Sequence, residues 1–182
     1  SEVEKAIEEI EKVIKEVRDK NRRVLEESKK LIRTVEETNK RNIEEIEKWI
    51  KTLDELTDRN SDKKVIEKVL KELEDEVRRH VEHSERVLRE AIKISEELVR
   101  RSEEVLKEVT ERVERIVRKV VRTEDAAKKA KEIIDKLRTL VEEVKRTNDK
   151  SLRDTREVVR RVEETLRRVE EKVKKRVDEI RK

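Results

Sequence analysis

The 182-residue sequence contains no glycine, proline, cysteine, methionine, phenylalanine or tyrosine, and its one tryptophan is Trp49. Without Gly or Pro, almost no position favours a positive φ angle or a fixed break in a helix. Without Cys, a disulfide framework and thiolate chemistry are excluded. Apolar runs are no longer than two or three residues, which excludes a helix that spans a bilayer.

Charged residues are abundant, at 55% of the chain, against about a quarter in ordinary globular proteins. High charge with few aromatics is also typical of disordered chains. Here 52 basic residues nearly balance 48 acidic ones, so self-repulsion is weak. The apolar residues are nearly all Val, Leu and Ile at regular helical spacing, and this periodicity favours helices over disorder.

Three apolar seams follow a spacing of three and four residues, from Val3 to Leu56, from Val65 to Val120 and from Ala127 to Ile180. Such a spacing is a heptad pattern. In the first segment a second stripe joins the seam, at Leu25, Ile32, Ile46 and Leu53. Three apolar positions per heptad make a face broad enough to contact two neighbouring helices.

The seams break at residues 57–62 and 122–125. We expect a single domain over residues 1–182, with helices over about 2–58, 62–121 and 124–181. Equal lengths and short turns predict an all-α, elongated, antiparallel (up-down-up) three-helix bundle with left-handed coiled-coil packing. Each helix would extend over roughly 87 Å.

Residues at the predicted helix ends match known capping preferences. Asn60 can adopt the left-handed conformation at the end of the first helix. Ser61 or Asp62 can cap the second helix, and Thr123 is the expected N-cap of the third, followed by two acids. Ser1 and Glu4 form a capping box.

Polar residues stand at seam positions where an aliphatic is expected. A turn near residue 60 pairs residues whose numbers add up to about 121, and a turn near residue 123 pairs residues whose numbers add up to about 246. This pairing predicts three polar layers: Asn21 with Ser102, Thr147 and Asn148; Ser28 with Ser95, Ser151 and Thr155; and Thr38, Asn39 and Asn42 with His80, His83, Ser84 and Thr165.

The free-energy cost of burying polar groups indicates the structural role of these layers. An isolated buried hydroxyl or amide costs about 1–3 kcal/mol, whereas groups in one layer can bond to one another and disfavour a slipped register. We therefore interpret the layers as buried hydrogen-bond networks that specify register. The alternative is that several of these side chains point to solvent.

The pattern offers little for catalysis, metals or nucleic acids. His80 and His83 share a helix face, but no further ligand with metal-site spacing accompanies them. We therefore expect these histidines to form hydrogen bonds or to face solvent. A buried neutral imidazole would also make stability depend on pH, because it would have to become charged on acidification. Paired glutamates lie among Lys and Arg as solvated ion pairs. The isoelectric point of about 9.1 is not accompanied by stacking aromatics. We expect no catalytic residue, cofactor, metal, specific nucleic acid or membrane partner.

The sequence resembles de novo designed parametric helical bundles with buried hydrogen-bond networks, including designed heterodimers and caged-helix scaffolds. The resemblance rests on a Gly-free composition dominated by Glu, Lys, Arg, Val, Leu and Ile, on the lone Trp49, and on the segments 37–42 (Glu-Thr-Asn-Lys-Arg-Asn) and 80–84 (His-Val-Glu-His-Ser). The resemblance covers the whole chain and departs in its frequent Val and in turns without Gly. It implies a non-enzymatic structural scaffold with no natural activity or location, soluble when expressed in a cytoplasm. The alternative is a helix-binding module that presents a groove to a fourth helix, or a homo-oligomer.

Overall fold

The computed structural model describes residues 2–59 and 62–182 and contains three α-helices in these ranges, with no strand. Helix α1 covers Glu2–Asp58, α2 covers Lys63–Val120 and α3 covers Glu124–Arg181. The all-α three-helix fold predicted from the seams is confirmed. The predicted helix ranges differ from the observed bounds by no more than one residue.

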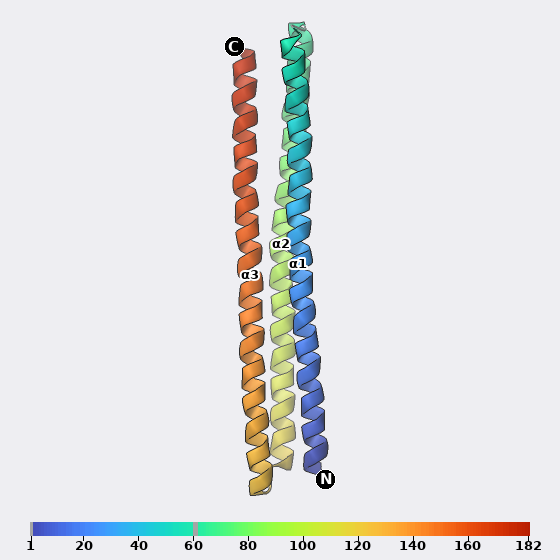
Figure 1. The fold of residues 1–182 in the computed structure, drawn as a ribbon, viewed down its shortest axis with the longest axis vertical. Coiled ribbons are helices and arrows are strands. Elements are labelled where there is room, and N and C mark those ends of the chain that lie inside the picture. Colours follow the sequence, from blue (N-terminus) through green and yellow to red (C-terminus); the bar gives the residue numbers. More distant parts are fainter. Residues whose placement is uncertain (1, 60–61) are drawn as a thin grey trace. The chain divides into compact units, whose positions relative to one another are not determined.

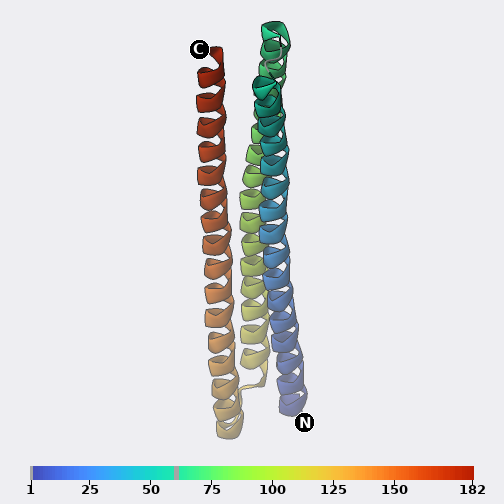
Figure 2. The ribbon, with the colours of Figure 1, turned by 45° about the horizontal axis from the view of Figure 1, so that its top comes forward.

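Packing divides the chain into two units, each of which takes a segment from every helix. Unit 1 comprises Ser1–Lys30 and Ile94–Asp154, and unit 2 comprises Leu31–Lys93 and Thr155–Lys182. Within each unit, α1 and α3 run in one direction and α2 in the other (Figures 1 and 2). This is the up-down-up order that two short turns impose on helices of equal length. The prediction that residues 1–182 form one domain stays a prediction.

Unit 1 buries aliphatic side chains from all three helices in one cluster. Its buried members are Ile10, Ile14 and Val17 of α1, Leu106 and Val113 of α2, and Ile133, Leu137, Leu140 and Val144 of α3. Every helix therefore buries a face against both of its neighbours.

Unit 2 contains two such clusters. One joins Ile46, Ile50 and Leu53 of α1 to Leu70, Leu73, Val77 and Val81 of α2 and to Val173 and Val177 of α3. The other joins Val35 to Leu88, Ala91, Val158, Val159, Val162 and Leu166. Trp49 is half-buried and packs against the first cluster.

The buried face of α1 moves from the predicted seam onto the second stripe in unit 2. Ile46 and Leu53, on the second stripe, are 0% exposed, while Trp49 and Leu56 of the seam are half-buried. An α-helix has 3.6 residues per turn, so a strict seven-residue pattern drifts by about 20° per heptad around a straight helix. The drift brings the second stripe inward.

The predicted seam of α3 is wrong at its start. Ala127 is exposed, and Ala126 is buried instead. The same offset buries Ile133 and Leu140 more deeply than their seam neighbours Ile134 and Val141. Adjacent aliphatics both fit a helical pattern, and the observed stripe at residues 126, 133 and 140 keeps an exact heptad.

Two of the predicted caps lie among the described residues. The backbone N–H of Ala126 donates to Thr123 Oγ1 at 3.2 Å, which confirms Thr123 as the N-cap of α3. The N–H of Lys64 donates to Asp62 Oδ1 at 3.1 Å, so Asp62 caps α2. The predictions for Ser1, Asn60 and Ser61 lie outside the described residues.

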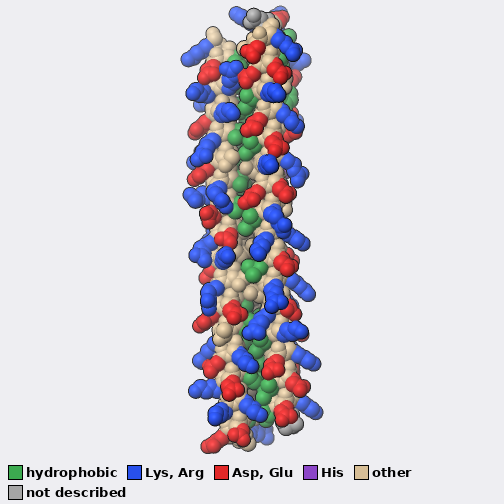
Figure 3. Space-filling view, viewed as in Figure 1, with side chains coloured by type: hydrophobic (Ala, Val, Ile, Leu, Met, Phe, Trp, Pro, Cys, Tyr) green, Lys and Arg blue, Asp and Glu red, His purple; other side chains and the backbone are tan. Residues whose placement is uncertain are grey.

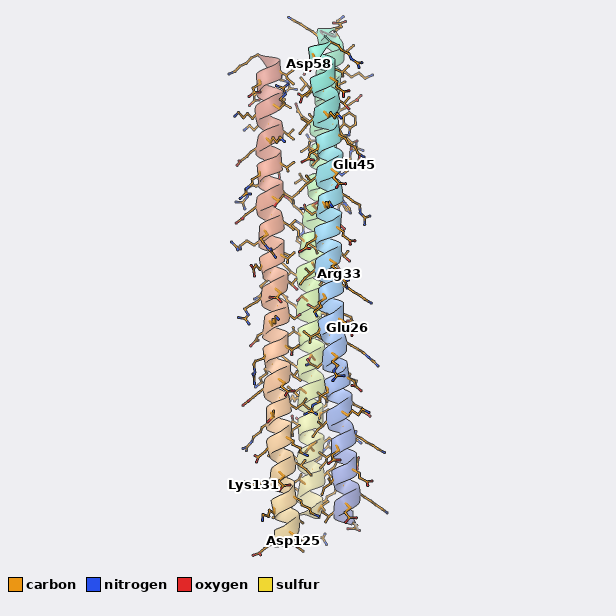
Figure 4. All side chains as sticks on the ribbon, in the orientation of Figure 1. Glu26, Arg33, Glu45, Asp58, Asp125 and Lys131 are labelled. Atoms are coloured by element: carbon orange, nitrogen blue, oxygen red, sulfur yellow. The ribbon has the colours of Figure 1, made fainter. Side chains whose placement is uncertain are left out.

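Charged side chains of both signs cover the exposed helix faces. On the face seen in Figure 3, basic and acidic residues alternate along α1 and α3, and apolar side chains reach the surface between these helices. Labelled examples such as Glu26, Arg33 and Lys131 are exposed (Figure 4). None of the helices, over the part of the chain that the structure describes, is long and apolar enough to cross a membrane.

Two matched core truncations test whether the units unfold together. Leu53 in unit 2 is 0% exposed and Leu140 in unit 1 is 1% exposed. We expect Leu53→Ala and Leu140→Ala each to reduce the free energy of unfolding by about 2–5 kcal/mol, because each leaves a cavity in a packed core. The measurement is urea denaturation followed by circular dichroism for all helices and by Trp49 fluorescence for unit 2.

In a single cooperative domain, both variants shift the circular dichroism and fluorescence curves together. A Leu140→Ala variant whose Trp49 transition stays at the wild-type midpoint would show that the units unfold independently.

Candidate functional site: polar core layers

Unit 1 brings together the four residues of the first predicted layer as two cross-helix pairs. Asn21 Nδ2 on α1 donates to Thr147 Oγ1 on α3 at 3.3 Å. Asn148 Nδ2 on α3 donates to Ser102 Oγ on α2 at 3.2 Å. Asn148 is almost fully buried, whereas the other three are half-buried. The heptad positions of α1, α2 and α3 thus bring amides and hydroxyls to one level.

The second predicted layer contains a short contact between two hydroxyls, one on α1 and one on α3. Ser28 Oγ and Ser151 Oγ are 2.6 Å apart, and both residues are buried. Either hydroxyl can donate, since a serine is both donor and acceptor. Ser95 is also buried in unit 1, and its hydroxyl makes no hydrogen bond among the described residues. Thr155, the fourth predicted member, is buried in unit 2.

Asn42 is the centre of the third layer, in unit 2. Its Nδ2 donates to Ser84 Oγ at 2.6 Å and lies 3.4 Å from His83 Nδ1. Its Oδ1 lies 3.2 Å from His80 Nδ1. These contacts require His80 to carry a proton on Nδ1 and His83 to accept there. One buried amide therefore uses both its N–H groups and its oxygen, all towards α2.

The carboxylate of Glu76, which is not a seam residue, lies beside this layer. Glu76 Oε2 is 3.4 Å from His80 Nε2, and Glu76 also pairs with Arg79. Across residues 2–59 and 62–182, no three His, Cys, Asp or Glu side chains gather closely enough to hold a metal ion. His83 is exposed and His80 half-buried, and the acid response of the two stays a hypothesis.

The remaining predicted members of the third layer do not join Asn42. Thr38 is half-buried, and Asn39 is buried with an unpaired Oδ1. Thr165 is half-buried and donates its hydroxyl to the backbone oxygen of Arg161, at 2.9 Å in its own helix. A threonine in a helix commonly bonds to the carbonyl one turn back, and this local bond replaces the predicted contact across the bundle.

The asparagines leave more polar capacity unused than the serines do. Buried oxygens without a hydrogen bond include Asn21 Oδ1, Asn39 Oδ1 and Asn148 Oδ1. Ser28, Ser84 and Ser102 each engage their single hydroxyl across the helices. An amide offers two donors and an acceptor, so a narrow space between helices satisfies a hydroxyl more readily.

Ion pairs between helices lie at the edges of the cores, and the sequence pattern did not predict them. In unit 1, Arg112 Nη2 lies 2.9 Å from Glu9 Oε1. In unit 2, Arg176 Nε donates to Asp54 Oδ1 at 2.6 Å, and this bond raises the pKa of the guanidinium. The pairing rule places Glu9 opposite Arg112, but the many ion pairs within single helices conceal such a match.

Glu170 is the carboxyl whose environment favours the neutral form. It lies in a groove between α2 and α3 of unit 2, together with Glu85 and Arg167. Partial desolvation raises the pKa of Glu170, the nearby charge of Glu85 raises it further, and Arg167 opposes both effects. At neutral pH, two like charges therefore face each other across the groove.

Comparison with known proteins gives a structural likeness and no family. The chain matches no model of a protein family, and no curated protein matches it. It is similar to a solved structure described as a computationally designed three helix bundle, with a TM-score of 0.34 and 19% sequence identity over 98% of this chain and 81% of that chain.

Two neighbouring asparagines provide a matched test of hydrogen-bond satisfaction. Asn42 contacts three polar side chains, whereas Asn39 has an unpaired buried oxygen. We expect Asn42→Leu to reduce the free energy of unfolding by about 1–3 kcal/mol, because it leaves Ser84 and His80 without their partner. Asn39→Leu should be neutral or stabilising, because it removes an unsatisfied amide.

Thermal and urea denaturation of both variants measure the difference. Equal destabilisation by the two substitutions would contradict a structural role of the Asn42 contacts.

Glu170 gives a prediction on pH. Because its pKa is raised in the folded state, folding favours protonation, and stability from this residue increases as pH falls from neutral towards the ordinary Glu value of about 4.3. Glu170→Gln should therefore stabilise the protein near pH 7, by less than about 1 kcal/mol for such an accessible group. This advantage should shrink as the pH approaches 4. Urea denaturation at several pH values measures it.

Glu157→Gln, at an exposed position of α3, is the control for loss of one negative charge. An equal gain in both variants would show that net charge, and not the pair with Glu85, is responsible.

Proposed function

We propose that this chain is a de novo designed structural scaffold, without a catalytic role, whose function is to hold three long helices in one register. Its composition supports the proposal, since Gly and Pro are absent and Val, Leu and Ile supply the core. Designers favour such idealised helical vocabulary because it avoids strained backbone positions. The resemblance to designed bundles with polar core layers points the same way.

The observation that carries the proposal is that polar side chains bond across every pair of helices. Asn42 and Ser84 connect α1 to α2, Asn148 and Ser102 connect α3 to α2, and Ser28 and Ser151 connect α1 to α3. All six residues occupy core positions, and five of them are buried. In unit 1 the polar pairs join α3 to α1 and to α2, and in unit 2 they join α1 to α2.

The energetic argument rests on the distance that a slipped helix travels. A shift of one turn moves a side chain by about 5.4 Å along the axis, which breaks a contact such as the 2.6 Å bond between Ser28 and Ser151. Each group left buried and unpaired then costs about 1–3 kcal/mol. Aliphatic side chains meet other aliphatics after the same slip and lose much less.

Closure of the cores favours a scaffold over an obligate oligomer. The exposed large hydrophobic side chains in the described ranges are Val65, Ile94 and Val121. Val65 and Val121 lie near the ends of α2. Scattered single apolar residues are ordinary on monomeric proteins. The aliphatic clusters of both units are otherwise formed from residues of this one chain.

The test replaces the polar pairs by aliphatics and measures molar mass by light scattering. We expect the unmodified chain to give 22.0 kDa at every micromolar concentration. A variant with Ser28→Val, Ser84→Val, Ser102→Val, Ser151→Val, Asn42→Leu and Asn148→Leu should melt at a higher temperature and form mixed oligomers, because the three pairs that penalise other registers are removed.

A swapped variant, Ser102→Asn with Asn148→Ser, retains a polar pair at the same level and should remain monomeric. The proposal fails if the unmodified chain self-associates, or if the variant with six substitutions remains a single species of 22.0 kDa.

A further inference from the structure

A groove between α1 and α2 in unit 1 is the part of the surface that the scaffold role leaves unexplained. It encloses about 200 Å³, and its apolar lining consists of Val17, Val24, Leu98, Val105 and, from α3, Val144. Val24, Leu98 and Val105 are only half-buried. Ile94 lies one turn before Leu98 on α2 and is 39% exposed. The groove therefore has an apolar floor that is incompletely covered.

The floor has the spacing of a coiled-coil surface. Val17 and Val24 on α1 are one heptad apart, and so are Leu98 and Val105 on α2. Apolar ridges at heptad spacing on two adjacent helices form the holes into which the side chains of a further helix pack. A helix is thus the occupant that fits this surface, rather than a small molecule or an extended segment.

A polar level interrupts the apolar floor midway. Asn21 lies between Val17 and Val24, and Ser102 lies between Leu98 and Val105; both line the groove. Asn21 uses its Nδ2 to bond to Thr147, whereas its Oδ1 is buried without a hydrogen bond. An aliphatic side chain packed over these two polar residues would remove them from water without a new hydrogen bond, so this level favours an occupant with a polar residue there.

The rims of the groove carry mainly positive charge. Lys20 and Arg23 on α1 and Arg101 on α2 face a single acid, Glu27. Arg101 pairs with Glu97, whereas Lys20 and Arg23 form no ion pair within residues 2–59 and 62–182. A second copy docked through the same groove would bring an identical basic rim, because a two-fold interface pairs a patch with itself. The charges therefore favour an acidic partner.

We infer that this groove is a docking site for an acidic amphipathic helix of another chain. The helix packs apolar residues at heptad spacing onto Val24, Leu98 and Val105 and directs Glu or Asp side chains to Lys20 and Arg23. It places a polar side chain, such as an asparagine, at the polar level midway along the groove. This is helix-in-groove recognition.

The experiment uses the full chain and a synthetic helical peptide of about 21 residues, or three heptads. The peptide carries Leu at core positions, one central Asn and Glu at the flanks, and fluorescence anisotropy at low ionic strength measures its binding. We expect saturable binding that Lys20→Glu with Arg23→Glu weakens by roughly tenfold, because charge reversal at a rim removes electrostatic complementarity.

The matched control is Arg22→Glu with Lys29→Glu, at exposed positions of α1 that do not line the groove. Both double variants change the net charge equally and should fold as the parent does by circular dichroism. The control should bind the peptide as the parent does. Equal loss of peptide affinity in the two variants would show that binding is unspecific electrostatic attraction, and would overturn the proposed site.

The polar level is tested by exchanging its partners. Asn21→Val should reverse the preference, so that a peptide with Val in place of its central Asn binds more tightly than the original peptide. An unchanged preference, or no saturable binding to the parent chain, overturns the proposal. A concentration-dependent dimer that Lys20→Glu with Arg23→Glu alters would assign the groove to a second copy and equally overturn it.

Discussion

The constraint on which this structure depends is that a polar group buried between helices needs a partner on a neighbouring helix. Aliphatic side chains such as Leu53 and Leu140 gain from burial in any register that covers them. The bond between Ser28 and Ser151 exists in one register only. Burial of apolar surface drives the helices together, and a few hydroxyls and amides select which arrangement results.

Much of the fold follows from the sequence because its signals are local and repeated. The absence of Gly and Pro, the apolar seams and the two breaks predict three helices, and Thr123 caps α3 as its residue type and position indicate. The choice between adjacent aliphatics is less accessible. Ala126 is buried in place of Ala127, and Leu53 lies deeper than Trp49, since small drifts of the helix face decide which of two neighbours points inward.

In the polar layers, the sequence predicts which residues lie at the same level of the bundle, whereas side-chain geometry determines which of them form hydrogen bonds. Residue numbering alone brings Ser102 to Asn148 and Asn42 to His80 and Ser84, because short turns fix which levels oppose each other. It does not foresee that Thr165 bonds to its own helix or that Asn39 keeps an unpaired oxygen. These outcomes depend on side-chain reach and on competing backbone acceptors, which sequence periodicity does not describe.

The difference between hydroxyl and amide accounts for the unpaired oxygens of Asn21, Asn39 and Asn148, but not for the unpaired hydroxyl of Ser95. A serine pair such as Ser28 and Ser151 closes on itself, because each hydroxyl both donates and accepts. Asn42 is satisfied because three polar atoms of α2 surround it. Asn21 meets one partner, Thr147, and its Oδ1 is buried without a hydrogen bond. An amide between helices is therefore costlier than a hydroxyl wherever the neighbouring helices supply too few partners.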